Sequence, residues 1–434
     1  MLLSLSVENY QAFRDVQELS MRRTYRHAVP SATGWDPQVS TLAAVYGANA
    51  SGKSTLVKAI DYLVGAVRDS YVRWPVDGGT QAEPFRLDRD SAGLPSSFEV
   101  EVRADDGLDY QYGFSVDSCR VVREWLYVYR TARRTELFTR DGAELRFGRP
   151  FRGPRTQLVD TARTRPNALT LAVGAQFGSD LLAPAHQAVV SIETYRASVH
   201  TDSGLPVMEL RSPSARAAVD LLTEHPERKA AFLELMRNAD IGVSDVSVDE
   251  PSLAEIKAWP ELEASTEWLN ENWPRIRRNL RQLRFTHTSA SGGVDLPFES
   301  ESDGTKALVS FAPIILAGLD EGRTVVIDEV DTSLHPFVVR ALVGLFADPS
   351  TNPRQAQLVF TTHDTSLLGR GTSSEPLARD QVWRTEKDPV TGAAELVAVA
   401  EYSPRKDESL ERGYLTGRYG GIPHIPTPLV SMDR

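Results

Sequence analysis

The apolar residues of this 434-residue chain change their spacing several times, and each spacing predicts a different element. Residues 2–9 combine apolar and polar positions in the manner of a first strand. Residues 41–46 form a short apolar run that is typical of a buried strand. Helical spacing follows at Leu56, Ala59, Ile60, Leu63, Val64 and Val67. We therefore predict a strand, a loop and a helix over residues 41–68.

Short runs of strand-forming residues between 98 and 147 predict a set of antiparallel strands. Turn-forming sequences such as Asp105-Asp106-Gly107 and Asp141-Gly142 separate several of these runs. The expected strands are Phe98–Arg103, Tyr110–Val116, Val121–Arg130, Thr135–Thr139 and Glu144–Phe147.

From about residue 150 to 290 the pattern becomes largely helical. Ala215–Asn238 predicts a helix pair broken at Pro226, and Trp259–Arg284 predicts another that is interrupted at Pro274. A sustained heptad repeat is absent from the sequence, so we expect no long coiled coil. Because the chemical motifs lie on both sides of this region, we interpret it as an inserted arm or lid.

The most specific motif is Gly47-Ala48-Asn49-Ala50-Ser51-Gly52-Lys53-Ser54-Thr55, which fits the phosphate-loop pattern G-x-x-x-x-G-K-[ST]. Its glycines permit backbone angles that let the loop turn its N–H groups inward, around phosphate oxygens at a helix N-terminus. Lys53 is expected to reach the β- and γ-phosphates, and the Ser54 hydroxyl to ligate Mg²⁺. The flanking strand and helix supply the context that this motif requires.

A second apolar strand, Arg323–Glu329, ends in two adjacent acidic residues, Asp328 and Glu329. A buried parallel strand has this composition. Asp328 is placed to hold Mg²⁺ through water. Glu329 is the candidate general base that orients the attacking water.

Three further segments surround this strand. Glu301–Lys306 opens a helical pattern over 307–319, and a Ser and a Gly at a helix N-terminus can bind an anion. Asp331–Pro336 follows the acidic pair directly, and Gln357–His363 is a strand that ends at His363. A histidine at the carboxyl end of such a strand can contact a γ-phosphate.

Composition narrows the class of protein. The net charge is −11, which argues against indiscriminate coating of nucleic acid but not against a local basic groove. One basic cluster spans Arg275–Arg284, and we favour its interpretation as a helix face paired with the acidic stretch Glu261–Glu271. Cys119 is the single cysteine, which suits a reducing cytoplasm, and neither a long apolar run nor a signal peptide is apparent.

Together these motifs resemble the ABC-type ATPase head shared by SMC, RecF and OLD-like (overcoming-lysogenisation-defect) proteins. Gly47–Thr55 matches the family's Walker A motif, Thr324–Glu329 its Walker B motif and catalytic glutamate, and Asn9–Arg14 its N-terminal segment. The remaining correspondences are Ser302, Asp303, Gly304 and Thr305 with the signature, Asp331 with the D-loop, and His363 with the switch histidine. The resemblance covers about residues 1–115 and 290–400.

The signature departs from the standard form, because Glu301 replaces the leading leucine and Asp303-Gly304-Thr305 replaces Gly-Gly-Gln. In this respect the chain resembles a bacterial branch of stand-alone anti-phage ATPases, found in abortive-infection and restriction-linked systems (AbiL/RloA-like, and the PARIS ATPase). The closing segment Tyr414–Pro423 is similar to the C-terminus of that branch. Gln81 is the candidate for the Q-loop, although no pattern fixes it.

The resemblance implies an α/β, ABC-type P-loop NTPase head: a mixed sheet with flanking helices and an antiparallel β subdomain. We expect residues 1–149 and 291–434 to form this head and 150–290 to form the mainly helical insertion. The resemblance also implies a homodimer or higher oligomer in which ATP and Mg²⁺ lie between protomers. The signature of one chain would cap the γ-phosphate held by the Walker A loop of the other.

The resemblance leads to an ATPase sensor or scaffold that gates a separately encoded effector, such as a Toprim-like nuclease, with a nucleic acid or a phage protein as the candidate trigger. The chain itself carries no nuclease motif. The alternative is a RecF- or SMC-like DNA-repair ATPase, for which the trigger would be a nucleic acid. A transporter subunit is disfavoured by the large central insertion, and GTP specificity by the lack of an N/T-K-x-D motif.

Overall fold

The computed structural model describes residues 1–434 except 25–33, 132, 197–212, 240–241, 251, 255–266, 269, 274–280, 291, 370–376, 405–407 and 423–434. The chain divides into two compact units. The first comprises Met1–Arg196, Gly318–Val330 and Leu342–Arg434, and the second comprises Ala197–Ala317 and Asp331–Ala341. Among the described helices, none combines the length and apolar character that a membrane crossing requires.

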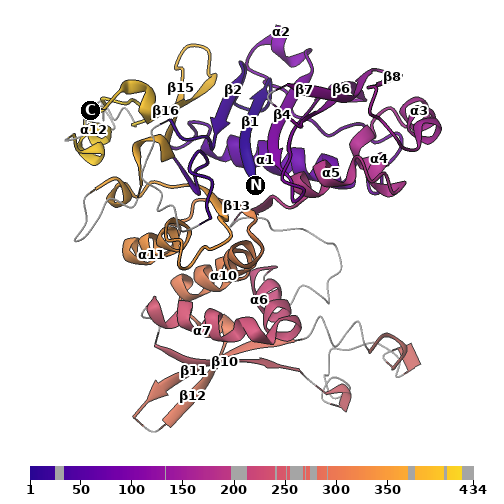
Figure 1. Ribbon diagram of the computed structural model, residues 1–434. Coiled ribbons are helices and arrows are strands. Elements are labelled where there is room, and N and C mark those ends of the chain that lie inside the picture. Colours follow the sequence, from indigo (N-terminus) through magenta and orange to yellow (C-terminus); the bar gives the residue numbers. More distant parts are fainter. Residues whose placement is uncertain are drawn as a thin grey trace, which may run out of the picture. The chain divides into compact units, whose positions relative to one another are not determined.

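A six-stranded sheet carries the phosphate loop of the first unit (Figure 1). Its order is β16 (Ala394–Ala398), β15 (Val382–Lys387), β3 (Leu42–Gly47), β14 (Gln357–Thr361), β13 (Thr324–Asp328) and β9 (Glu193–Arg196). The neighbours from β15 to β9 run parallel, and β16 is antiparallel to β15. The strands predicted at 41–46, 323–329 and 357–363 are therefore confirmed, and the structure places them as neighbours in one sheet.

A seven-stranded antiparallel sheet forms the other layer of this unit. Its order is β2 (Gln17–Ser20), β1 (Leu2–Glu8), β4 (Ser96–Arg103), β5 (Asp109–Val116), β6 (Val121–Tyr129), β7 (Arg134–Asp141) and β8 (Glu144–Phe147). The five strands predicted between 98 and 147 are all present. Alternate residues of β4 are buried, as expected for a sheet with one face against a core.

Helix α1 (Lys53–Asp69) packs against the antiparallel sheet through aromatic contacts. Tyr62 of α1 lies 4.9 Å from Phe98 of β4, measured between ring centroids. The apolar residues of α1 share one core with both sheets. Together with the strand–loop–helix order, this arrangement confirms the expected ABC-type P-loop NTPase fold.

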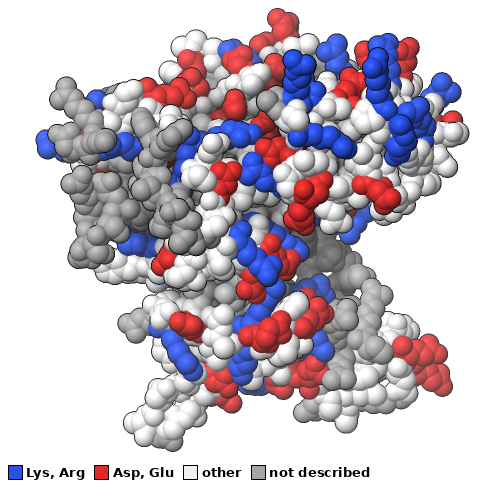
Figure 2. Space-filling model, viewed as in Figure 1, with Lys and Arg blue, Asp and Glu red and all other residues white. Residues whose placement is uncertain are grey.

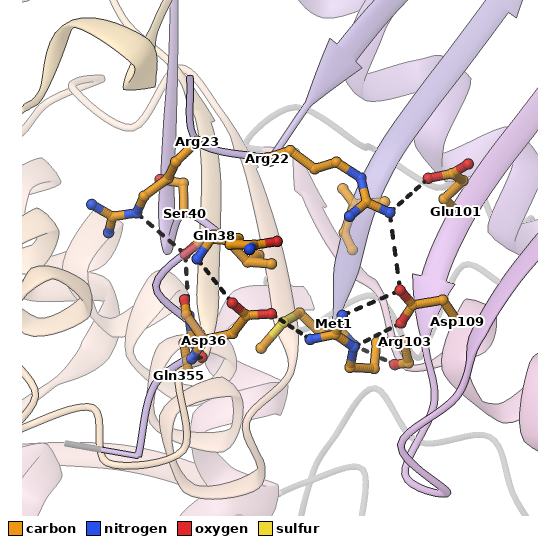
Figure 3. A network of polar contacts seen from close by, with 12 residues as sticks. Met1, Arg22, Arg23, Asp36, Gln38, Ser40, Glu101, Arg103, Asp109 and Gln355 are labelled. Carbon is orange, nitrogen blue, oxygen red and sulfur yellow. Dashed lines mark hydrogen bonds and ion pairs between the residues drawn. The ribbon is translucent and has the colours of Figure 1, made fainter. Parts of the chain in front are cut away.

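A polar network also joins the two sheets (Figure 3). At the end of β4, Arg103 donates to Asp109 of β5 at 2.7 Å and to Asp36, before β3, at 2.6 Å. These hydrogen bonds raise the pKa of Arg103, so its guanidinium group stays protonated. Gln355, which precedes β14, donates to the carbonyl oxygens of Asp36 and Val39. The network fixes the entry of β3, and hence the start of the phosphate loop, against the antiparallel sheet.

Helices α3 (Arg155–Thr164), α4 (Thr170–Gln176) and α5 (Ala183–Val190) belong to this first unit. Two buried charges hold them there. Glu124 of β6 accepts hydrogen bonds from the N–H groups of Thr170 and Leu171, and so caps α4. Arg140 of β7 donates to the carbonyl oxygen of Ala168 at 2.6 Å. The expected insertion therefore does not begin at residue 150.

The second unit contains a three-stranded antiparallel sheet that the sequence pattern did not predict. Its strands are β10 (Val243–Asp249), β11 (Gln282–Ser289) and β12 (Gly292–Pro297). The helix expected over Trp259–Arg284 is wrong at its end, because residues 282–284 belong to β11. Much of its remainder lies outside the described residues.

The helix pair expected over Ala215–Asn238 is confirmed, as α6 (Pro213–Glu224) and α7 (Lys229–Asn238) with a 3-10 turn at Pro226–Arg228 between them. The other elements of the chain are α2 (Arg89–Ala92), α10 (Asp303–Glu321), α11 (Pro336–Ala347), α12 (Leu410–Leu415) and 3-10 turns at Phe298–Ser300, Thr365–Leu368, Arg379–Gln381 and Val399–Tyr402.

The basic cluster at Arg275–Arg284 also differs from its expected helix-face arrangement. Arg284 pairs with Asp249 of β10 at 3.0 Å, and Arg281 pairs with Glu250 at 2.5 Å. These two partners thus come from the end of β10 and the residue that follows it, rather than from Glu261–Glu271. Arg275, Arg277 and Arg278 lie outside the described residues.

Candidate nucleotide site

The phosphate loop connects β3 to α1 and needs glycine at both ends. Gly47 has a φ of 155° and Gly52 a φ of 113°, conformations that side chains oppose. A Cβ at Gly47 would lie 2.4 Å from Thr385 Oγ1, and one at Gly52 would lie 2.8 Å from the Cβ of Ala394. The motif's glycines are therefore required by space as well as by backbone angle.

The N-terminus of α1 has the form of an anion site. Gly52 is its N-cap residue, and no side chain caps the first turn. The backbone N–H groups of an uncapped helix N-terminus need hydrogen-bond acceptors from outside the helix, and the helix dipole favours acceptors with a negative charge. Lys53 is buried, and its ammonium donates to the carbonyl oxygens of Gly47 at 2.8 Å and Ala48 at 3.0 Å. The Lys53 side chain thus lies over the phosphate loop and contacts its first two residues.

A cavity of about 460 Å³ opens above this loop. Asn49, Ala50, Gly52, Lys53, Ser54 and Thr55 line it together with Glu329, which follows β13. Its other lining residues are Gln11, Ala12, Lys58, Leu87, Lys387 and Gly392. Of the predicted nucleotide-binding residues, Gly47 forms the base of the loop, and Ser51 is buried beneath it.

Sequence reasoning did not single out Lys58, Leu87 or Lys387 as site residues. Lys58 lies one helical turn beyond the loop and could have been noticed from its spacing. Lys387 lies at the end of β15, and only the pairing of β15 with β3 brings it to the cavity. A local pattern contains no signal for that pairing.

The two acids at the end of β13 are held by Thr361, the last residue of β14. The backbone N–H of Glu329 donates to Thr361 Oγ1 at 2.7 Å, and that hydroxyl donates to Asp328 Oδ1 at 2.7 Å. Glu329 has a φ of 52°, which is strained for a residue with a side chain. This backbone conformation changes the chain direction at Glu329, which is the residue after β13 that lines the cavity.

These residues fit Mg²⁺ and a nucleoside triphosphate. A lysine, an uncapped helix N-terminus and glycines with space for backbone approach suit phosphate oxygens. The Ser54 hydroxyl and the Asp328 carboxylate are the oxygen ligands that Mg²⁺ prefers.

The signature residues line a cavity of their own in the second unit. Ser302 Oγ accepts a hydrogen bond from the Thr305 N–H at 3.1 Å, and so caps α10 at Asp303. Ser302, Gly304 and Thr305 border a cavity of about 410 Å³ together with Ser333 and His335. A Cβ at Gly304 would lie 3.1 Å from the Ser333 carbonyl oxygen, so the segment after Asp331 packs closely on the signature.

The departure from the usual signature has a structural counterpart. Glu301 is buried, and its Oε1 lies 2.8 Å from Nε2 of His287 on β11. A charged residue can replace leucine here because β11 supplies this partner. His287 was not recognised in the sequence, since β11, the strand that carries it, was not predicted.

Asp328 does not line the cavity over the phosphate loop, and neither do three further predicted residues. His363 follows β14 and is exposed, and Asp331 belongs to the second unit. Gln81, the Q-loop candidate, is exposed with a φ of 57° and is not among the lining residues. Their proposed roles therefore stay predictions.

The two tyrosines of the closing segment are buried in the structure. Tyr414 is 7% exposed and Tyr419 is 1% exposed. Arg418 pairs with Glu408 at 2.8 Å. Trp268, in contrast, is an exposed residue in the middle region.

Comparison with known proteins identifies a family. A family model described as "AAA domain, putative AbiEii toxin, Type IV TA system" matches residues 42–369. No curated protein sequence matches the chain. The chain is similar to a solved SMC head bound to the C-winged helix domain of ScpA, with 13% identity, 95% of this chain and 99% of that chain covered, and a TM-score of 0.43.

Two other solved structures give comparable values. The SMC head domain from Thermotoga maritima has 15% identity, 92% and 98% coverage and a TM-score of 0.37. The recombination mediator protein RecF has 11% identity, 92% and 98% coverage and a TM-score of 0.36.

Proposed function

Since this chain belongs to that AAA-domain family, we propose that it is an ATP-hydrolysing sensor or scaffold of a bacterial anti-phage system. The observation that carries the ATPase proposal is the meeting of Lys53, Ser54 and Glu329 at one cavity, although Glu329 lies far along the chain from the other two. A phosphate anchor, a metal-ligand hydroxyl and a carboxylate base are the parts that hydrolysis of a phosphoanhydride needs.

Each residue then has a definite role. Lys53 and the amides of the loop hold the β- and γ-phosphates, and Ser54 and Asp328 hold Mg²⁺. Glu329 accepts the proton of the water that attacks the γ-phosphate. His363 contacts the γ-phosphate from the end of β14. Bound Mg²⁺ supplies charge neutralisation on the phosphate oxygens.

We propose that ATP is shared between two copies of the chain. Ser302, Gly304 and Thr305 line a cavity whose lining residues all belong to the second unit, and which they could present to another copy of the chain. The signature would then act in trans, with Asp303 and the D-loop residue Asp331 at the same interface. ATP binding would favour the paired state, and hydrolysis would release it.

We further propose that the paired state gates a separately encoded effector, such as a Toprim-like nuclease. The family description, with its toxin and its type IV system, supports an effector-linked role. The cytoplasm is the expected compartment.

A specific observation favours the second candidate, a RecF- or SMC-like ATPase that acts on DNA. Between Arg120 and Arg165 the chain carries twelve arginines and five acidic residues, although its net charge is −11. Blue side chains gather in Figure 2 over the region where Figure 1 labels β6, β7, β8 and α3.

Six of these arginines come together at one end of the antiparallel sheet. The β6–β7 turn contributes three, and the segment after β8 contributes three, because the Gly148 N–H bonds the Leu137 carbonyl oxygen and brings that segment beside β7. All six are exposed, and none forms an ion pair within the described part of the chain. They are Arg130, Arg133, Arg134, Arg149, Arg152 and Arg155. Such a group suits a phosphate backbone.

One paired experiment separates the two functions. Phage plaques are counted on cells that carry the gene with its neighbours, and ATP hydrolysis by the purified protein is measured with and without duplex DNA. The variants are a fourfold Arg→Ser change at Arg133, Arg134, Arg149 and Arg152 and, as the matched control, Arg→Lys at the same positions.

The sensor function predicts fewer plaques for the wild type than for empty cells. The DNA function predicts hydrolysis that DNA stimulates, with stimulation abolished in the Ser variant and kept in the Lys variant. The salt slope of DNA binding should also fall by about 0.9 for every arginine that no longer neutralises a phosphate. Unchanged plaque numbers would contradict the sensor function, and hydrolysis that ignores DNA at every salt concentration would contradict the alternative.

A further inference from the structure

Thr385, on β15, braces the phosphate loop from the side away from the cavity. Its Oγ1 lies 2.5 Å from Ser51 Oγ and donates to the Tyr46 carbonyl oxygen at 3.3 Å. Thr385 is 0% exposed and Ser51 is 3% exposed. In the sheet, Thr385 is the register partner of Gly47, the first residue of the motif. One buried hydroxyl therefore connects the start and the middle of the loop.

The C-terminal segment Tyr414–Gly421 packs on this part of β15. Gly420 and Gly421 both have a φ of 72°, a conformation that favours glycine. A Cβ at Gly420 would lie 2.4 Å from Glu386 Oε2, and one at Gly421 would lie 3.3 Å from the Thr385 carbonyl oxygen. These glycines allow the segment to approach the strand next to Thr385.

Tyr414 extends this contact toward the loop. Its ring lies 5.4 Å from that of Tyr46, the residue before Gly47, and its hydroxyl donates to the Gly421 carbonyl oxygen at 3.2 Å. Burial raises the pKa of the Tyr414 phenol. The Tyr414 side chain therefore joins the C-terminal segment to the residue that precedes the phosphate loop.

The rest of the segment is held in place independently of the loop. The Tyr419 hydroxyl donates to Glu408 Oε1 at 2.6 Å, and the Tyr419 ring lies edge-on to Tyr402 at 5.7 Å. A Cβ at Gly413 would lie 2.5 Å from the Tyr419 ring, so this fold of the segment is closely packed. Tyr414 thus projects from a fixed support.

We propose that Thr385 and Tyr414 are positioning residues, which hold the phosphate loop in its phosphate-binding conformation without contacting the nucleotide. Neither residue lines the cavity over the loop. The inference rests on the proposed ATP site and adds to it two residues that order the phosphate loop before the nucleotide binds. A loop that is ordered beforehand loses less conformational entropy on binding, so its ligand binds more tightly.

This role has a measurable signature. Because the brace acts on the loop, its removal should weaken binding of the phosphate chain and leave recognition of the base unchanged. The affinities for ATP and for inorganic tripolyphosphate should therefore fall by the same factor. The KM for ATP should rise, while kcat changes little because Lys53 and Glu329 are intact.

Thr385→Val keeps the shape of the side chain and removes its hydroxyl, whereas the control Thr385→Ser keeps the hydroxyl. Binding of ATP and of tripolyphosphate is measured by calorimetry, steady-state hydrolysis gives KM and kcat, and thermal unfolding checks the fold. Loss of a buried hydrogen bond should weaken both ligands about tenfold in Thr385→Val, and Thr385→Ser should match the wild type. Tyr414→Phe should show a smaller loss in the same direction.

If Thr385→Val and Tyr414→Phe both bind ATP and tripolyphosphate as tightly as the wild type, the positioning role is overturned, while the proposed ATP site is unaffected. Unequal losses for ATP and tripolyphosphate would also overturn it, because they would point to a contact with the base. If Thr385→Val does not fold, Tyr414→Phe decides the result. A wild-type protein that binds neither ligand would overturn the proposed ATP site, and this inference with it.

Discussion

Replacement of Lys53 by alanine is expected to abolish ATP hydrolysis and to weaken ATP binding. The change removes the one lysine that folds over the phosphate loop, and with it the positive charge that faces the β- and γ-phosphates. Removal of a single preorganised electrostatic interaction in an active site lowers turnover by about 10²–10³-fold. Phosphate release and nucleotide binding by the purified variant test this expectation.

Lys229→Ala is the matched control. Lys229 is a partly exposed lysine of α7 that pairs with Asp245 at 2.9 Å, and surface pairs of this kind contribute little. Its replacement should leave hydrolysis at the wild-type rate. A Lys53→Ala protein with full activity would exclude the phosphate-loop assignment.

Glu329→Gln should separate binding from chemistry. The amide keeps the shape of the side chain but cannot accept the proton of the attacking water, so turnover should fall by about 10²–10⁴-fold. Lys53 and Ser54 are unchanged, and ATP should therefore bind and persist. With ATP trapped, the paired state should accumulate and elute early in size-exclusion chromatography.

The control for this variant is Glu18→Gln, at an exposed position of β2. It should hydrolyse ATP normally and show no ATP-dependent change in elution. Normal turnover in Glu329→Gln, together with unchanged elution, would reject Glu329 as the base.

The parts of the site that the sequence predicted are those with a local signature. Gly47–Thr55 constrains its own backbone through glycines, and Asp328 and Glu329 mark the end of a buried strand. In each case the residues that determine the structure are adjacent in the chain. Periodicity also predicted five strands of the seven-stranded sheet, β4 to β8, because the hairpins that connect them join neighbours in sequence.

The parts that escaped prediction depend on distant pairing. Thr385 lies 334 residues from Ser51, and only the placement of β15 beside β3 brings their hydroxyls together. The beginning of the insertion was misplaced because two strand residues bind a segment that follows much later: Glu124 binds the start of α4, and Arg140 binds the connection before it. In β11, Leu283 and Phe285 alternate with polar residues, but a short alternating run after a helical pattern is ambiguous.

The central claim is that two copies of the chain share each ATP. The most direct measurement mixes Lys53→Ala protein with Ser302→Arg protein, each inactive alone, and records hydrolysis. A mixed pair contains one composite site with an intact phosphate loop from one copy and an intact signature from the other. Our account predicts that activity returns on mixing and that Ser302→Arg protein alone still binds ATP. A mixture that stays inactive, with ATP binding abolished in Ser302→Arg, would contradict it.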